Sequence, residues 1–274
     1  MSDYPTGTLM SGKRGLVMGV ANKNSIAWAI AQQLAAQGAE LAFTYQGDKL
    51  KRRVEPLASS VGSDFLLDCD VTDDEQMDAA FAALKDKWGK IDFLVHAIAF
   101  AGRDQLEGSF VESTTREGFK SALDISAFSF VDAARRASEM MNEGGSMVTL
   151  TYLGSERVVP NYNVMGVAKA ALEASTRYIA ADLGPRGIRV NAISAGPIKT
   201  LAAAGIGSGR HMFRFNKAAS ALQDNTDPKG VAGAALYLLS DLGLSCTGEV
   251  HHVDGGFHAI GMPQEAPLRE SLES

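Results

Sequence analysis

Residues 15–38 read GLVMGVANKNSIAWAIAQQLAAQG and predict a buried β-strand, a tight turn and an α-helix. The apolar run that opens this stretch has the length of a strand that is buried on both faces. Ile26, Ile30 and Leu34 then follow at helical spacing, and Gly38 is typical of the position after a last helical turn. A strand that leads directly into a helix is the repeating unit of α/β folds with a parallel sheet.

The same alternation continues along the rest of the chain. The expected strands are 15–21, 39–44, 64–70, 91–100, 146–152, 187–194 and 248–256. The expected helices are 22–38, 48–60, 73–89, 114–142, 161–184 and 209–218, with a last one that starts at 226–228. Strands that alternate with helices predict an α/β fold: a doubly wound, Rossmann-type domain whose seven parallel strands are joined by right-handed crossovers. We expect one domain over 1–262, with a substrate loop at about 196–226 and a polar tail at 263–274.

Composition and charge exclude several classes of protein. The 274 residues are 46% hydrophobic and carry a net charge of −6, which argues against a general binder of nucleic acid or of membrane surfaces. No apolar stretch approaches the roughly 18 residues of a membrane span, and the first residues lack the pattern of a secretion signal. Cys69 and Cys246 fit no metal spacing and are expected to be reduced core residues of a cytoplasmic protein.

A second stretch, residues 151–169 (TYLGSERVVPNYNVMGVAK), carries the candidate reactive side chains. Tyr162 and Lys169 stand near the start of an expected helix, and their spacing is close to two turns. Both side chains therefore share one face, about 10 Å apart along the axis. A nearby ammonium group helps a phenol to polarise an oxygen atom at neutral pH. The alternative interpretation is a half-buried tyrosine with an unrelated surface lysine.

The turn after the first strand has features of a dinucleotide phosphate site. Gly19 permits a tight turn, and the N–H groups of the following helix would point at a pyrophosphate. Ser25 adds a hydroxyl donor. Ala21 and Asn24 occupy the later glycine positions of the common G-x-G-x-x-G motif, so a plain strand-to-helix turn is the alternative.

The ends of the next two strands bear on which dinucleotide is bound. A site selective for NAD often has an acid after its second strand, and this chain has Gln46 there. Four cations follow on the next expected helix: Lys49, Lys51, Arg52 and Arg53. NADPH is therefore plausible, and the alternative, which we favour for these cations, is a solvated helix face. Asp70 ends the third strand where an adenine ring would lie, and a helix cap is its alternative role.

Together these residues resemble the short-chain dehydrogenase/reductase superfamily, whose signature is Tyr-x-x-x-Lys. This chain departs from it by the wider step from Tyr162 to Lys169, and by His96-Ala97-Ile98-Ala99 in place of an Asn-Asn-Ala-Gly turn. Both departures are typical of one branch, the bacterial NADH-dependent enoyl-acyl-carrier-protein reductases. The resemblance covers about residues 10–262 and rests on 19, 25–27, 45–46, 69–71, 150–154, 160–166, 189–201, 248–250 and 253–256.

The resemblance implies that NADH reduces the trans-2 double bond of an enoyl thioester carried by acyl carrier protein. Tyr162 would donate a hydrogen bond to the thioester carbonyl, Lys169 would hold the nicotinamide ribose, and Tyr152 would line the acyl pocket. The implied cofactor residues are Gly19, Ser25, Ile26, Gln46, Asp70, Val71, Ala97, Ile98, Lys169, Gly196, Ile198 and Thr200. The implied substrate residues are Ala99, Phe100, Tyr152, Tyr162 and Leu201. No metal site is expected, and the implied assembly is a homotetramer packed through the helices at 114–142 and 161–183.

Two further features concern ligands of such an enzyme. Arg210, Arg214 and Lys217 stand at helical spacing, so they could form a landing site for an acidic carrier protein or simply a solvated helix face. Ala99 stands where the family usually has glycine, beside the pocket that diphenyl-ether inhibitors occupy. Its extra methyl group predicts weaker inhibition by such compounds.

Two other functions fit parts of the pattern. A carbonyl reductase, for example of 3-ketoacyl chains, would use Tyr162 together with a hydroxyl near the fifth strand, and Thr149 is available there. A catalytically silent NAD-binding regulatory or scaffold protein is the other alternative, and the presence of both Tyr162 and Lys169 counts against it. The sequence leaves acyl chain length and the choice between NADH and NADPH open.

Overall fold

Seven parallel strands form one sheet in the computed structural model, which describes residues 4–200 and 209–267. The strands are β1 (Arg14–Met18), β2 (Glu40–Tyr45), β3 (Leu66–Asp68), β4 (Ile91–His96), β5 (Met141–Thr151), β6 (Arg189–Ala195) and β7 (Val250–Val253). Their order across the sheet is β3-β2-β1-β4-β5-β6-β7, so the strand order reverses between β1 and β4. Doubly wound sheets bind their ligands at such a reversal, outside the carboxyl ends of the strands. The predicted seven-stranded, Rossmann-type fold is confirmed.

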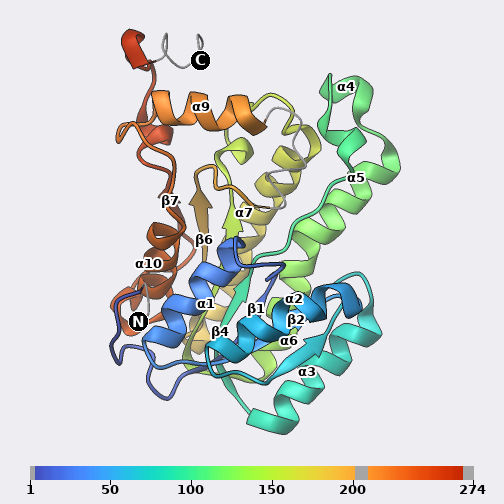
Figure 1. Cartoon of the computed structure of the whole chain (residues 1–274). Helices are drawn as coiled ribbons and strands as arrows, with labels where there is room; N and C mark the ends of the chain where they lie inside the picture. The colour runs from blue at the N-terminus through green and yellow to red at the C-terminus, as the bar shows by residue number, and fades with distance from the viewer. Residues whose placement is uncertain (1–3, 201–208, 268–274) are drawn as a thin grey trace.

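Helices cover both faces of the sheet (Figure 1). On one face lie α1 (Ile26–Ala36), α2 (Gly47–Ser60) and α10 (Pro228–Leu239). On the other lie α3 (Asp74–Trp88), α6 (Ser129–Glu139) and α7 (Asn163–Leu183). The short α4 (Phe110–Ser113) and α5 (Arg116–Leu123) precede α6, while α9 (Gly209–Ala219) lies across the carboxyl ends of β6 and β7.

Alternate residues of the central strand enter the two cores. Leu16 and Met18 of β1 pack against α3, α6 and α7, whereas Val17 packs against α1 and α10. All three side chains are fully buried. Burial of one such side chain stabilises a fold by roughly 1.5–3 kcal/mol, so an apolar residue is favoured at every position of this strand. This explains the continuous apolar run from Gly15 to Met18.

Two predicted elements are wrong at the edge of the site. The strand predicted at 91–100 ends at His96, because the chain then turns out of the sheet and the N–H of Phe100 bonds to Ser126 Oγ (3.0 Å). The single helix predicted at 114–142 is divided into α5, a π-helical turn at Asp124–Phe128 and α6. Ser126 lies in that π turn, and its hydroxyl also donates to the Phe100 carbonyl (3.2 Å). The irregular turn thus anchors the loop that leaves β4.

Other boundaries shift by a few residues. β5 begins at Met141 rather than 146, and its register against β4 shifts between Ile91 and Phe93. The strands predicted at 64–70 and 248–256 are shorter, as given above. α7 begins at Asn163 rather than 161, after Asn161 adopts a positive φ of 63°. Tyr162 is therefore the N-cap residue of α7.

Local signals at several helix starts are confirmed. Asp73 caps α3 by accepting hydrogen bonds from the N–H groups of Glu75 (3.0 Å) and Gln76 (3.1 Å). Asp70 is therefore not the N-cap of α3, and its carboxylate is available to the site. Pro228 occupies the first turn of α10. No helix in the described ranges is long and apolar enough to cross a membrane.

Candidate active site

A main cavity of about 580 Å³ opens at the carboxyl ends of β1 to β5. An adjoining, mostly apolar pocket of about 440 Å³ extends it toward β6 and α9. The main cavity is lined by these predicted residues: Gly19, Ser25, Ile26, Gln46, Asp70, Val71, Ala97, Ile98, Lys169 and Thr200. Ala99, Phe100, Tyr152 and Tyr162 line both spaces, whereas Gly196 and Ile198 line the apolar pocket only. Leu201, the remaining predicted residue, lies outside the described part of the chain.

Gly19 lies at a tight turn in the wall of the main cavity, where β1 ends next to β4. Its φ is 99°, a left-handed value that strains any residue with a side chain. A Cβ atom there would overlap the carbonyl oxygen of Ala97, which cannot move freely because the Ala97 N–H bonds to the Met18 carbonyl (3.1 Å). Glycine is therefore required for β1 and β4 to end side by side.

Helix α1 begins inside the cavity and presents hydrogen-bond donors. Ser25 Oγ accepts from the N–H groups of Ala21 (3.0 Å) and Asn22 (3.1 Å), which fixes the turn and leaves its own O–H free to donate. The N–H groups of Ile26 and Ala27, in the first turn of α1, have no carbonyl partner within the helix. These donors and the positive end of the helix dipole suit a pyrophosphate.

Gln46 and Asp70 close the other end of the cavity. Gln46 Nε2 donates to Asp70 Oδ2 (2.6 Å), and Asp70 Oδ1 accepts from the N–H and hydroxyl groups of Thr72 (2.9 and 2.8 Å). Burial acts to raise the pKa of Asp70, but the hydrogen bonds from Thr72 and Gln46 outweigh it and lower the pKa. A carboxylate is thus held at this end, where it can accept from an adenine amino group.

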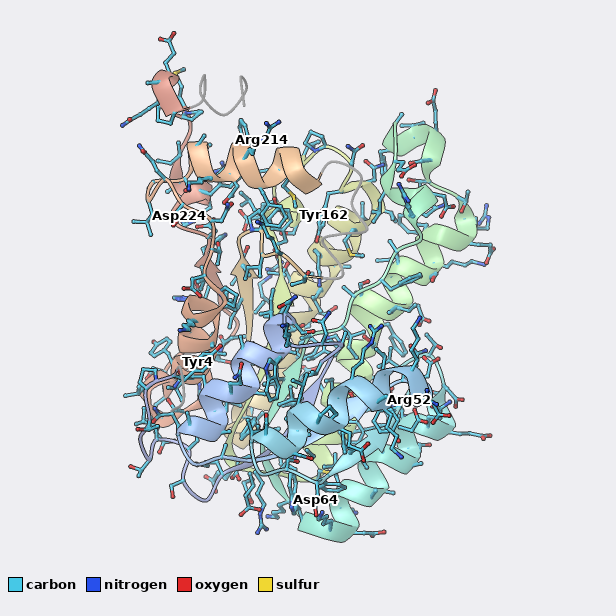
Figure 2. All side chains as sticks on the ribbon, in the orientation of Figure 1. Tyr4, Arg52, Asp64, Tyr162, Arg214 and Asp224 are labelled. Carbon is cyan, nitrogen blue, oxygen red and sulfur yellow. The ribbon has the colours of Figure 1, made fainter. Side chains whose placement is uncertain are left out.

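The cations after Gln46 take no part in the cavity. Lys49, Lys51, Arg52 and Arg53 are all exposed, and none of the four lines the cavity. Lys51 instead lies over the Tyr45 ring, with Nζ 5.9 Å from its centre, and Figure 2 shows Arg52 on α2 far from Tyr162. Their placement fits the solvated helix face rather than a site for a 2′-phosphate.

Tyr152 and Tyr162 meet where the main cavity joins the apolar pocket. Their ring centres are 5.0 Å apart and the planes meet at 74°, an edge-to-face contact. Burial raises the pKa of Tyr162 well above its usual value, and Tyr152 and Glu173 raise it further. Burial likewise raises the pKa of Tyr152 to about 12. Both phenols are therefore protonated at neutral pH, so each can donate a hydrogen bond.

Lys169 lies in the same cavity and is buried. Its Nζ donates to the Leu150 carbonyl (2.7 Å), which leaves two N–H bonds free. Burial lowers the pKa of Lys169 to about 8, and the charge of Glu173 opposes this shift. The sequence suggested that the ammonium would tune the phenol, but burial is the main cause of the Tyr162 shift and Lys169 is not among its causes.

Thr149, the hydroxyl available to a carbonyl reductase, lines neither the main cavity nor the apolar pocket. It is fully buried and bonds to His96 Nδ1 (3.1 Å), while His96 Nε2 bonds to Ser129 Oγ (2.9 Å). Ser129 donates its own proton to the Ile125 carbonyl (2.6 Å), so Nε2 carries the histidine proton and Nδ1 accepts from Thr149. Burial lowers the pKa of His96 to about 3, and the nearby Lys169 adds to the effect. His96, Thr149 and Ser129 therefore form an uncharged, buried hydrogen-bonded group next to the site.

Several lining residues were not found from the sequence. They come from strand ends, from helices and from the turn between β3 and α3: Tyr45, Leu50, Thr72, Ile125, Leu150, Thr151, Met165 and Met212. Leu150 and Thr151 end β5, so their place at a strand's carboxyl end was a usable signal. Ile125 lies in the π turn, and no local pattern marks that turn.

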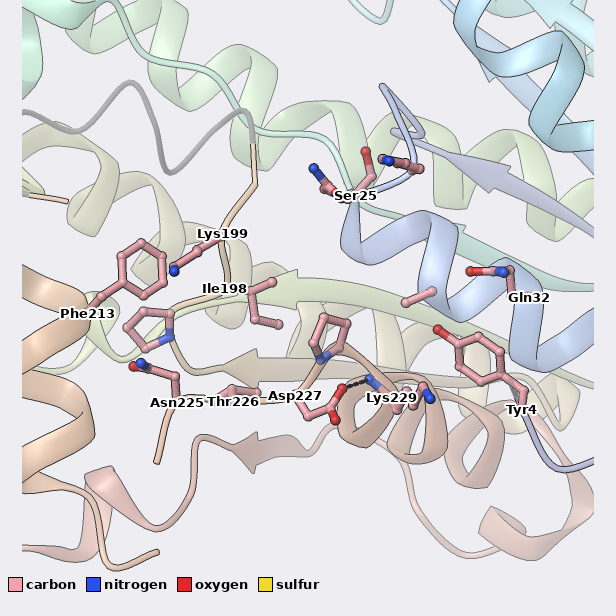
Figure 3. Close-up of a pocket in the computed structure, with 15 residues that line it drawn as sticks. Tyr4, Ser25, Gln32, Ile198, Lys199, Phe213, Asn225, Thr226, Asp227 and Lys229 are labelled. Carbon is pink, nitrogen blue, oxygen red and sulfur yellow. Dashed lines mark hydrogen bonds between the residues drawn. The ribbon is translucent and has the colours of Figure 1, made fainter. Parts of the chain in front are cut away.

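A third hollow of about 440 Å³ lies on the other side of the segment 196–199, between α1, α9 and α10 (Figure 3). It shares Ser25, Pro197 and Ile198 with the spaces described above, and its lining includes neither of the two tyrosines nor Lys169. Lys199 lines it near Phe213 of α9. The candidate reactive groups thus belong to the main cavity and the apolar pocket.

Known proteins with similar sequences and structures point to one family. The sequence model of the family described as enoyl-(acyl carrier protein) reductase matches residues 19–258. The chain is 59% identical to enoyl-[acyl-carrier-protein] reductase [NADH] 2 of Rhizobium meliloti over 95% of this chain and 97% of that protein. It is 54% identical to the NADH-dependent enoyl-[acyl-carrier-protein] reductase FabI of Escherichia coli, over 92% of this chain and 97% of that protein. A solved enoyl-acyl-carrier-protein reductase of Anaplasma phagocytophilum, in complex with NAD, superimposes with a TM-score of 0.92 at 51% identity, covering 96% of this chain and all of that one.

Proposed function

Because this chain belongs to the enoyl-acyl-carrier-protein reductase family, we propose that Tyr162, Tyr152 and Lys169 carry out that family's reaction at the main cavity. The reaction reduces the trans-2 double bond of an enoyl thioester with NADH, the last step of the fatty-acid elongation cycle. The observation that carries the proposal is the buried, protonated phenol of Tyr162, which lies against Tyr152 and shares the cavity with the Lys169 ammonium.

The cavity residues fit a nicotinamide dinucleotide. The side-chain-free Gly19 turn and the first N–H groups of α1 would hold the pyrophosphate, with Asp70 at the adenine end. The two free N–H bonds of Lys169 would hold the ribose hydroxyls at the nicotinamide end. The exposed cations after Gln46 supply no partner for a 2′-phosphate, which supports NADH as the cofactor.

Bound NADH supplies a hydride to the β-carbon of the thioester. As negative charge develops on the thioester oxygen, Tyr162 stabilises it by donating its phenolic proton in a hydrogen bond. The high pKa of Tyr162 makes it a donor that keeps its proton, so this role needs no proton transfer from the residue. Lys169 keeps a positive charge nearby, and Tyr152 packs against Tyr162 and lines the pocket for the acyl chain. The apolar pocket limits the water around the developing enolate, and one proton taken up at the α-carbon completes the saturated thioester, so the hydride and this proton together balance the reduction.

One assay separates this reaction from its alternatives. NADH oxidation is followed with crotonyl and acetoacetyl thioesters in parallel, and NADPH is tested with each. Turnover of the crotonyl thioester with NADH is expected. Preferential turnover of the acetoacetyl thioester would instead indicate a carbonyl reductase, although Thr149 is bonded to His96 beneath the site. Turnover of neither would indicate a silent binding protein.

We infer that α9 receives the acyl carrier protein. Arg214 is exposed on α9, above Tyr162 in Figure 2, and Lys217 forms a long ion pair with Asp224 (3.8 Å). The side chain of Arg210 lies outside the described part of the chain. Glutamate at positions 210 and 214 should raise KM for carrier-linked substrates more than for coenzyme A analogues. Lys85→Glu on α3, at the far end of the molecule, is the control, and equal effects on both substrates would refute the landing site.

We further propose a cytoplasmic homotetramer. Helix α7 exposes Val167 and Tyr178, and Phe128 of the π turn is also exposed, so apolar side chains are available for packing through these helices. Light scattering after size exclusion measures the assembly. A monomer at micromolar concentration would refute the tetramer, and Tyr178→Glu should weaken it.

A further inference from the structure

Glu173 is a buried residue close to Tyr162, and no step of the proposed reaction uses it. It stands one helical turn after Lys169 on α7, and only 6% of it is exposed. Its Oε1 atom accepts hydrogen bonds from Thr151 Oγ1 (2.6 Å) and Ser155 Oγ (2.5 Å). Thr151 ends β5, and Ser155 ends the 3₁₀ turn η3 (Leu153–Ser155). One carboxylate oxygen thus joins a strand, a turn and a helix.

Tyr152 lies in the segment between the two residues, Thr151 and Ser155, that bond to Glu173. It follows Thr151 directly, and its carbonyl accepts a hydrogen bond from the Ser155 N–H (2.9 Å). The backbone on both sides of Tyr152 is therefore tied to Glu173. Because the Tyr152 ring packs edge-on against Tyr162, a movement of this turn changes the contact between the two rings.

We propose that Glu173 is a positioning residue, whose carboxylate holds the Thr151–Ser155 turn and so keeps Tyr152 against Tyr162. The inference rests on the function proposed above for the two tyrosines. A carboxylate can only accept hydrogen bonds, so both hydroxyl groups must donate to it and neither can rotate freely. Hydrogen bonds to a charged acceptor are also about twice as strong as neutral ones. Such bonds suit a segment that must hold the Tyr152 ring in place.

Glu173 also acts on Lys169 through its charge. The groups around the Lys169 ammonium are the Leu150 carbonyl, the neutral His96 of β4 and Glu173 on its own helix. Burial lowers the pKa of Lys169 to about 8, and Glu173 opposes that shift. Loss of the carboxylate therefore lowers this pKa further. If the reaction needs the ammonium, the alkaline limb of its pH profile then moves to lower pH.

The test compares variants of the full-length enzyme with crotonyl thioester and NADH. Glu173→Gln keeps the size of the side chain and removes its charge, so kcat should fall by about tenfold to a hundredfold. The alkaline limb of kcat/KM against pH should also move to lower pH. Ser155→Ala removes one hydrogen bond and keeps the charge, so kcat should fall without movement of the limb. Ser175→Ala is the matched control, because within the described residues that hydroxyl bonds to the Ala171 carbonyl of the same helix (2.8 Å) and to no other group.

Three outcomes would overturn the inference. One is a wild-type kcat in Glu173→Gln, and another is a lowered kcat with an unmoved alkaline limb in that variant. Should Glu173→Gln fail to fold, a wild-type kcat in Ser155→Ala would overturn it instead. Failure of the proposed function is distinguishable, because the wild-type enzyme would then not oxidise NADH with the crotonyl thioester at all.

Discussion

The 3₁₀ turn η3, which follows Tyr152, packs on helix α7 where Gly154 meets Gly166. Replacement of Gly166 by alanine should displace this turn. A Cβ atom on Gly166 would lie 2.6 Å from the Gly154 carbonyl oxygen, which is a backbone atom. An ordinary C···O separation is about 3.3 Å, so the turn must retreat by about 0.7 Å. Gly154 itself lies against the Tyr162 ring, and Tyr152 begins the same turn. Gly166→Ala therefore moves the backbone that holds both tyrosines.

Two opposing contributions to the free energy of unfolding decide how much Gly166→Ala changes stability. Alanine in place of a helical glycine stabilises by about 0.8–1 kcal/mol, whereas overpacking costs about 1–3 kcal/mol. The net loss in the free energy of unfolding should therefore lie between about 0 and 2 kcal/mol. Catalysis is more sensitive, because a misplacement of about 1 Å can cost a hundredfold. We expect kcat to fall by roughly tenfold to a hundredfold in a protein that is still folded.

Denaturant unfolding and steady-state kinetics with crotonyl thioester measure the two quantities. Gly233→Ala is the matched control: this glycine is also helical, in α10, and a Cβ atom there meets no atom within 4 Å. It should stabilise the protein by up to about 1 kcal/mol and leave kcat unchanged. If Gly166→Ala also gained stability and kept full kcat, the close packing of η3 on α7 would be refuted.

Three further predictions concern the cofactor, the pH dependence and inhibitors. The value of kcat/KM should fall as pH rises through about 8, because the Lys169 ammonium, charged below its pKa, loses its proton there; a flat profile from pH 7 to 10 would contradict this. Gly19→Ala should weaken NADH binding at least tenfold by fluorescence titration, because its Cβ atom would overlap the Ala97 carbonyl; an unchanged Kd would count against the phosphate turn. Ala99→Gly should tighten inhibition by diphenyl ethers by about fivefold, roughly 1 kcal/mol, and a variant no more sensitive than wild type would reject a role for that methyl group.

Local patterns in the sequence were sufficient for the architecture. The apolar run at 15–21 and the helical stripe of α1 predict a buried parallel strand and its crossover helix, and the same pattern recurs along the chain. The positions of Gly19, Asp70 and Lys169 follow from that architecture, because the carboxyl ends of parallel strands share one edge of the sheet. These residues could therefore be placed near one another from the sequence alone.

The parts that could not be predicted depend on contacts between distant segments. The π turn forms where Ser126 bonds to Phe100, and neither residue marks the turn by itself. Glu173 reads as an ordinary helix residue until the hydroxyls of Thr151 and Ser155 are brought to it. Burial of Tyr162 is likewise a property of the packed structure, so its raised pKa could not be inferred from its spacing to Lys169.

The rate of the Tyr162→Phe variant tests the central claim most directly. The change removes the hydroxyl and keeps the ring that packs against Tyr152. Loss of an oxyanion donor costs roughly 2.7–4 kcal/mol, so kcat with an enoyl thioester and NADH should fall by about 10²–10³-fold while Kd for NADH stays the same. An unchanged kcat would contradict the account and would move the donor role to Tyr152 or to a water molecule.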